Sequence, residues 1–131
     1  SISTGHAGSP EEMLSRLETM VLMGTDIPLI AIRKQLASAI DIIIQLERLR
    51  DKSRRVTEIT EVVGYEDGEI RLNPLFVFKE IKTETNESFV REEGCYMETG
   101  EGVAGQLFSS GNTLIHRKKL EAADVRLEDE V

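Results

Sequence analysis

The two histidines and the single cysteine are the side chains of this sequence that most often bind metals or act as nucleophiles. His6 and His116 lie far apart, and neither has a Cys, Asp or Glu at the spacing of a metal site. Cys95 has no base close to it in the sequence, so a buried or incidental thiol is the better interpretation. No spacing of Ser, His and Asp indicates a catalytic triad. The sequence therefore predicts no metal site and no self-contained catalytic group.

Glycine-rich segments are the usual means of holding a nucleotide phosphate. The sequence contains no GxxxxGK[ST] pattern, so it lacks the backbone cradle and the lysine of P-loop enzymes. Residues 100–105 spell GxGxxG, but only residues 106–108 separate them from Ser109-Ser110-Gly111. A dinucleotide site needs a helix after the last glycine, and no helix of useful length fits there. These glycines are better interpreted as loop or turn residues, and we expect no ATP hydrolysis by this chain alone.

His6 is the histidine with the more suggestive surroundings. It lies in segment 3–10, between a predicted strand end and a predicted helix N-terminus. A phosphate group there would meet backbone N–H groups and the positive end of the helix dipole. From the residues alone, a structural histidine is the simpler interpretation.

Residues 48–55 form the one basic cluster of an acidic chain whose formal net charge is -8. Arg50, Arg54 and Arg55 are the candidates for contact with a phosphate group or an acidic partner. The alternative is a solvated hairpin turn, with Glu58 and Glu61 available to neutralise its charge. The net negative charge disfavours general binding to nucleic acid.

Two amphipathic helices are predicted before any strand. Ser9-Pro10-Glu11-Glu12 has the N-cap, first-turn proline and capping-box glutamate of a helix start, and this helix runs to about Met23. A second helix begins at Pro28 and ends near Asp41. The predicted buried positions are Leu14, Leu17, Met20 and Val21 on the first helix, and Ile32, Leu36, Ala39, Ile40 and Ile43 on one face of the second.

A small antiparallel meander of about three strands is predicted next. Its β-branched segments are 42–46 and 55–63, separated by a turn at 51–53. After a turn at 66–68, the third strand covers 69–72 and 75–78, and Asn73-Pro74 interrupts it at a sheet edge or a kink. Beyond it we predict a polar loop over 79–93, a further strand over 89–97 and a short helix over 116–123.

The bulk properties fit one soluble domain of 131 residues. The hydrophobic share is 40% and the charged share 31%, and no apolar run is long enough to span a bilayer. A single cysteine and no signal-peptide pattern favour a reducing, cytoplasmic setting. The first residue is Ser1, which suggests a processed product or a piece of something longer.

Segments 3–10 and 14–23 together resemble the His-box region of type II/IV secretion ATPases. The similarity is greatest to the Flp/Tad pilus-assembly (CpaF-type) branch, and it covers residues 1 to 78 best. It continues through Leu29, Ile32-Arg33, Gln35, 37–41, 54–56 and 59–62. Segment 113–117 resembles the C-terminal tail of that branch.

The resemblance implies the C-terminal part of a RecA-like α/β motor, with residues 1–79 in the ATPase domain and 80–131 in a C-terminal extension. The family forms cytoplasmic, usually hexameric rings that bind ATP and Mg²⁺ at subunit boundaries and act on an inner-membrane platform. His6 corresponds to the His-box residue near the γ-phosphate, with Thr4 and Arg16 beside it. The phosphate loop and acidic boxes would precede Ser1, so this chain alone is expected to bind no cofactor.

Two features limit how far the properties of the family can be assigned to this chain. The family commonly has asparagine where this chain has Gly8, and the segment 79–100 does not align with it.

The main alternative is a non-enzymatic interaction module that docks on the ATPase ring or its membrane platform through the basic turn or the polar loop. A third hypothesis is an independent enzyme of unrecognised chemistry, although no partner base or nucleophile is evident.

Overall fold

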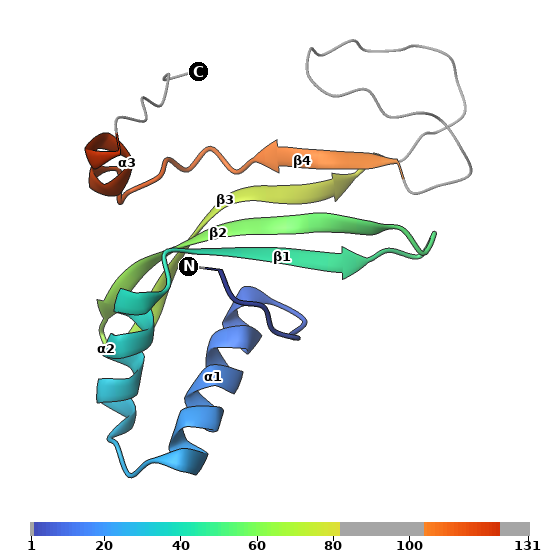
Figure 1. The fold of residues 1–131 in the computed structure, drawn as a ribbon. Helices are drawn as coiled ribbons and strands as arrows, with labels where there is room; N and C mark the ends of the chain where they lie inside the picture. Colours follow the sequence, from blue (N-terminus) through green and yellow to red (C-terminus); the bar gives the residue numbers. More distant parts are fainter. Residues whose placement is uncertain (1, 82–103, 124–131) are drawn as a thin grey trace, which may run out of the picture.

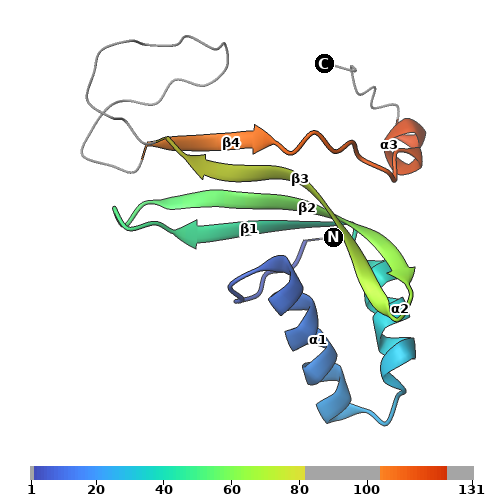
Figure 2. The same ribbon diagram turned by 180° about the vertical axis from the view of Figure 1, so that it is seen from behind.

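The fold is a four-stranded antiparallel sheet with two longer helices packed against it and a short third helix. The computed structural model describes residues 2–81 and 104–123. Its elements are α1 (Pro10–Gly24), α2 (Leu29–Ala39), β1 (Ile42–Arg48), β2 (Arg54–Glu66), β3 (Glu69–Glu80), β4 (Gly105–Ser109) and α3 (Lys118–Ala122). The strand order is β1-β2-β3-β4, and α1 and α2 lie together on the β1 side (Figures 1 and 2). The predicted mixed fold, two helices followed by an antiparallel sheet, is confirmed.

Both long helices begin where the sequence predicts. The Ser9 side chain accepts a hydrogen bond of 3.2 Å from the Glu12 N–H, and Pro10 occupies the first turn of α1. Leu14 of α1 and Ile32 of α2 are buried. No helix in the described part of the chain is long and apolar enough to cross a membrane.

The predicted buried faces of the helices are partly wrong. Met20 is 53% exposed and Ala39 is also exposed. Among the described elements, α1 makes its main contacts with α2 and the edge strand β1, so little of its circumference is covered. The half-buried positions are Leu17, Val21, Leu36, Ile40 and Ile43.

Both hairpin turns form where the sequence has turn residues. The Asp51 carboxylate accepts hydrogen bonds from the Ser53 N–H at 2.9 Å and the Ser53 hydroxyl at 2.6 Å, which closes the β1–β2 turn. In the β2–β3 turn Asp67 and Gly68 have φ values of 52° and 87°. Two consecutive positive φ angles are typical of the tight type I′ hairpin turn.

The predicted interruption of the third strand at Asn73-Pro74 is wrong, because β3 runs through these residues without a break. The strand is also an inner one, with β2 and β4 as neighbours. Pro74 has no N–H to donate, and the β2–β3 register shifts between Ile59 and Thr60, directly across from it. Strand β4 pairs only with residues from Phe76 onward, so Pro74 lies outside that ladder. The register passes from Phe76 to Pro74 and leaves Leu75 without a partner, so the irregularity beside the proline is a bulge in β3 itself.

Strand β4 was not predicted, because its first residue, Gly105, was interpreted as a loop glycine. A Cβ atom at Gly105 would collide with the Phe78 ring and would lie 2.7 Å from the Lys79 carbonyl oxygen, so this position admits no side chain. The predicted helix over 116–123 is confirmed as α3. The predicted strand over 89–97 and the polar loop beyond residue 81 lie outside the described residues.

Candidate functional site

His6 lies in an exposed loop that is held on two sides. Its backbone carbonyl accepts a hydrogen bond from Arg16 Nη1 of α1. The neighbouring Ala7 carbonyl accepts a 3.0 Å hydrogen bond from the Gln45 amide of β1. The His6 side chain is exposed and forms no hydrogen bond or ion pair with the described residues, and Thr4 is also exposed. The predicted site residues His6 and Arg16 are thus brought together by the backbone, and the imidazole remains accessible.

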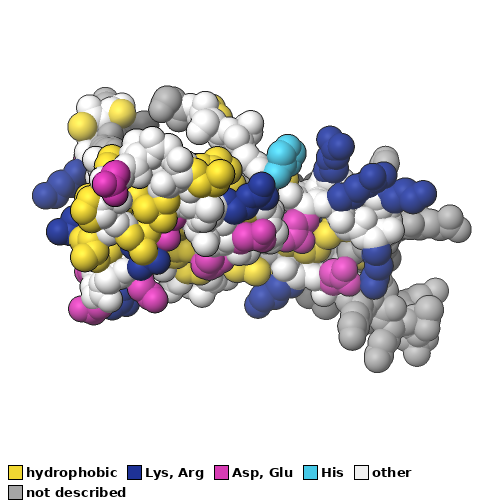
Figure 3. All heavy atoms as spheres, turned by 90° about the horizontal axis from the view of Figure 1, so that it is seen from below, with side chains coloured by type: hydrophobic (Ala, Val, Ile, Leu, Met, Phe, Trp, Pro, Cys, Tyr) yellow, Lys and Arg dark blue, Asp and Glu magenta, His cyan; other side chains and the backbone are white. Residues whose placement is uncertain are grey.

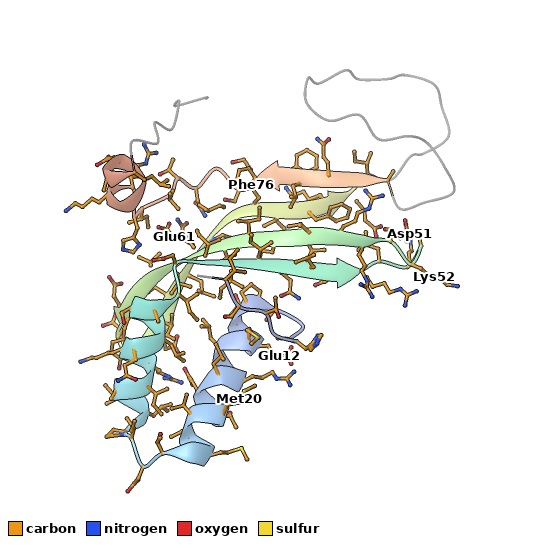
Figure 4. All side chains as sticks on the ribbon, viewed as in Figure 1. Glu12, Met20, Asp51, Lys52, Glu61 and Phe76 are labelled. Carbon is orange, nitrogen blue, oxygen red and sulfur yellow. The ribbon has the colours of Figure 1, made fainter. Side chains whose placement is uncertain are left out.

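The N-terminus of α1 is already occupied by the protein's own oxygen atoms. The Gly8 N–H donates to Glu12 Oε2 at 2.7 Å, and Ser9 caps the Glu12 N–H. Glu12 lies beside the loop in Figure 4. A Cβ atom at Gly8 would lie 2.7 Å from the same Glu12 oxygen, so a larger residue here would displace the carboxylate. An anion at this helix end would have to replace Glu12.

A shallow hollow of about 280 Å³ runs along α1 below the His6 loop. Its lining side chains are Glu12, Ser15, Arg16, Thr19 and Met20. All five come from one exposed face of the helix, so the hollow offers a mixed polar and apolar surface and no enclosed cavity. The guanidinium group of Arg16 links this hollow to the His6 loop.

The three arginines predicted to contact phosphate do not share one site. Arg50 forms a 3.1 Å ion pair with Glu80 at the end of β3. Arg55 Nε donates to the Ser53 hydroxyl at 3.3 Å. Arg54 lies on the opposite face from Arg55, because successive residues of a strand alternate. The strand register instead places Arg48 directly across from Arg54.

Glu61, expected to neutralise the basic turn, binds a different part of the chain. Its carboxylate accepts hydrogen bonds from the Ile115 N–H at 2.9 Å, the His116 N–H at 2.7 Å and the Asn73 amide at 2.9 Å. His116 Nδ1 lies 3.2 Å from Glu61 Oε1, and Asn73 also donates to the Thr113 carbonyl at 3.0 Å. We call Glu61 and segment 113–117 the C-terminal tether (Figure 4).

The electrostatics of the C-terminal tether favour an ionised Glu61. Only 1% of the residue is exposed, and this burial by itself raises the pKa of the carboxyl group. The hydrogen bonds from Ile115, Asn73 and His116, together with the charge of the imidazole, lower the pKa by more than burial raises it. The pKa of Glu61 therefore lies below its ordinary value. Counting back from the Asp67-Gly68 turn would put Asn73 across from Val62, and the register shift between Val62 and Gly64 brings Asn73 across from Glu61 instead, so the sequence held no local signal for this site.

A second ion pair fixes the helices to each other and to the sheet. Arg33 binds the Glu18 carboxylate through two nitrogens, at 2.9 and 3.2 Å, and donates to the Gly68 carbonyl at 2.6 Å. The hydrogen bonds that Arg33 donates to Glu18 raise the pKa of Arg33, although burial opposes this shift. These contacts are structural, since they join α1, α2 and the β2–β3 turn.

Within residues 2–81 and 104–123, no group of three or more His, Cys, Asp or Glu side chains is placed to hold a metal ion. Gly105, the last glycine of the GxGxxG pattern, begins β4 and packs against Phe78. The earlier glycines of that pattern and Cys95 lie outside the described residues. No protein-family model matches the sequence, and no curated protein is significantly similar to it.

Proposed function

We propose that this chain is part of a RecA-like motor of the type II/IV secretion ATPase class, in which its His6 loop contacts ATP. The remaining nucleotide contacts come from residues outside this sequence, because the sequence has no phosphate loop. The observation that carries the proposal is an accessible imidazole on a loop fixed by Gln45 and Arg16. A loop fixed in this way presents its side chain with little loss of conformational freedom on binding.

The contacts at α1 indicate how the loop would meet a phosphate group. At the start of the helix, the side chains of Glu12 and Ser9 already accept from the N–H groups of Gly8 and Glu12. The phosphate contacts are therefore expected from the side chains of His6, Arg16 and Thr4, and not from the helix backbone. A histidine at the γ-phosphate can change its hydrogen bonding when that phosphate leaves, which is the basis of a nucleotide switch.

Exposed apolar side chains support assembly with further protein. Buried apolar side chains within the described chain are few, namely Pro10, Leu14, Ile32, Val62 and Leu75. Met23 is 84% exposed and Ile30 is 58% exposed, both near the α1–α2 connection. In this proposal the chain packs into a hexameric cytoplasmic ring that acts on an inner-membrane platform and uses ATP with Mg²⁺.

In this proposal the parent motor is the longer protein that includes the phosphate loop upstream of Ser1. His6→Ala is expected to lower the ATPase rate of the parent motor by at least about tenfold. The physical reason is that a contact to the transferred phosphate is lost. The free energy of unfolding of the 131-residue chain should change by less than about 0.5 kcal/mol, because His6 is exposed. The measurements are steady-state turnover and urea denaturation. Gln35→Glu, a conservative change of an α2 side chain away from the loop, is the control, and wild-type turnover in His6→Ala would refute the assigned role.

The second candidate function is a docking module without a nucleotide role, which the exposed apolar side chains also favour. Calorimetric titration with MgATP separates the two, using this chain and the parent motor side by side. Binding only by the parent motor, weakened by His6→Ala, supports the shared nucleotide site. Two results together would favour the docking module. The parent motor would bind MgATP equally well with and without His6→Ala, and this chain would bind the parent ring whether or not nucleotide is present.

A further inference from the structure

The end of the β1–β2 hairpin carries two arginines on one face. Arg48 and Arg54 form the last paired positions of these strands, and both are exposed. Directly opposite residues of an antiparallel pair point to the same face, with Cβ atoms about 5 Å apart. Like charges at such positions are destabilising unless a counter-charge lies between them.

The described residues supply no such counter-charge. Neither Arg48 nor Arg54 forms an ion pair with a carboxylate of residues 2–81 or 104–123, and Arg48 Nε reaches only the Lys52 carbonyl, at 3.4 Å. The acidic residue of the turn, Asp51, binds the N–H and hydroxyl of Ser53. Glu47 lies on the other face, across from Arg55.

The surroundings concentrate positive charge at this point. Residues 48–55 carry five arginine or lysine side chains and one aspartate, a local charge of +4 in a chain of net charge -8. Figure 3 shows Lys and Arg side chains gathered at the end where Figure 1 places this turn, and Asp51 and Lys52 mark its tip in Figure 4. An anion approaching the protein is attracted to this end.

We infer that Arg48 and Arg54 bind one phosphate-class oxyanion between their guanidinium groups. Each guanidinium can offer two parallel N–H donors, and a tetrahedral dianion has enough oxygens to accept from both at once. The anion would also cancel the repulsion between the two arginines. The phosphate can be free or belong to a lipid headgroup. This site is independent of the role proposed for His6, which lies in a different loop.

Isothermal titration of the chain with inorganic phosphate at low ionic strength tests the inference. We expect saturable binding that Arg48→Gln and Arg54→Gln each weaken at least about tenfold, because charge-assisted bidentate hydrogen bonds are lost. The control is Arg71→Gln, which removes an equally charged, 59% exposed side chain that pairs with Glu66. That variant should bind phosphate within about twofold of the wild type. An equal loss in Arg71→Gln would overturn the inference, since it would indicate nonspecific charge attraction.

Two further measurements complete the test. The melting temperature of Arg54→Gln in phosphate-free, low-salt buffer should equal or exceed that of the wild type, which shows that lost binding is not lost folding. Cosedimentation with vesicles that contain phosphatidic acid, whose headgroup is a phosphate monoester, against vesicles of phosphatidylcholine alone, identifies the source of the phosphate. If the wild type binds the anionic vesicles and both arginine variants do not, the phosphate belongs to a lipid headgroup. If the wild type binds inorganic phosphate and not the vesicles, the ligand is a free phosphate. Binding to neither overturns the inference.

Discussion

Ile32→Asp is expected to unfold the chain, whereas the same substitution at Ile30 of the same helix leaves it folded. Ile32 is 1% exposed, and its helix α2 contacts α1, β2 and β3. A carboxylate placed there would be buried without a partner, or would have to be protonated. Such a change costs on the order of 4 kcal/mol or more, which is a large part of the stability of a small domain.

Ile30 provides the matched control because it is 58% exposed two residues away. Ile30→Asp should keep the free energy of unfolding within about 0.5 kcal/mol of the wild-type value. Circular dichroism during urea denaturation measures both variants. If Ile32→Asp unfolds cooperatively at the wild-type midpoint, the face of α2 assigned to the core is wrong.

Glu61→Ala should detach segment 113–117 from the sheet and lower the free energy of unfolding by about 3 kcal/mol. The substitution leaves the N–H groups of Ile115 and His116 and the amide of Asn73 without their shared acceptor. Chemical denaturation measures the stability, and amide hydrogen exchange at Ile115 and His116 measures the detachment. Glu66→Ala, which removes an exposed carboxylate paired with Arg71, should change stability by less than about 0.5 kcal/mol.

The pH dependence of stability provides a second readout for Glu61. Its pKa in the folded chain lies below the ordinary value of 4.5. A carboxylate with a lowered folded-state pKa stabilises the protein fully above its unfolded-state pKa, and this contribution disappears as the pH falls through the folded-state value. The wild-type chain should therefore lose stability below about pH 4.5, and Glu61→Ala should lose less over the same range. Equal slopes for both proteins would contradict this assignment.

The parts of the fold that were predicted correctly depend on neighbours close in sequence. The Ser9 cap and Pro10 define the start of α1, and Asp67-Gly68 defines a tight turn, whatever the rest of the chain does. The hydrogen bond from Arg16 to the His6 carbonyl is similarly local, since it joins one loop to the helix that follows it, but the nucleotide role of both residues stays a prediction.

The parts that were missed depend on contacts between distant residues. The bonds from Ile115 and His116 to Glu61 cross 54 and 55 positions, and no local pattern indicates them. Strand β4 begins at a glycine whose position is explained by the Phe78 ring and the Lys79 carbonyl oxygen, both more than twenty positions away. The exposure of Met20 follows from how little surrounds α1, which periodicity alone does not reveal. The Arg48–Arg54 pair becomes visible only when the strand register is known.

The C-terminal tether also has a consequence for the order in which the chain is completed during synthesis. Glu61 emerges from the ribosome together with β2, and Asn73, 12 positions later, is the first of its partners to follow. Ile115 and His116 arrive only when more than forty further residues have been made. Closing so long a loop is entropically costlier than closing the β2–β3 hairpin, so the hairpin precedes the docking of the tail. Until then water must solvate the Glu61 carboxylate, and its burial marks the arrival of the C-terminal segment.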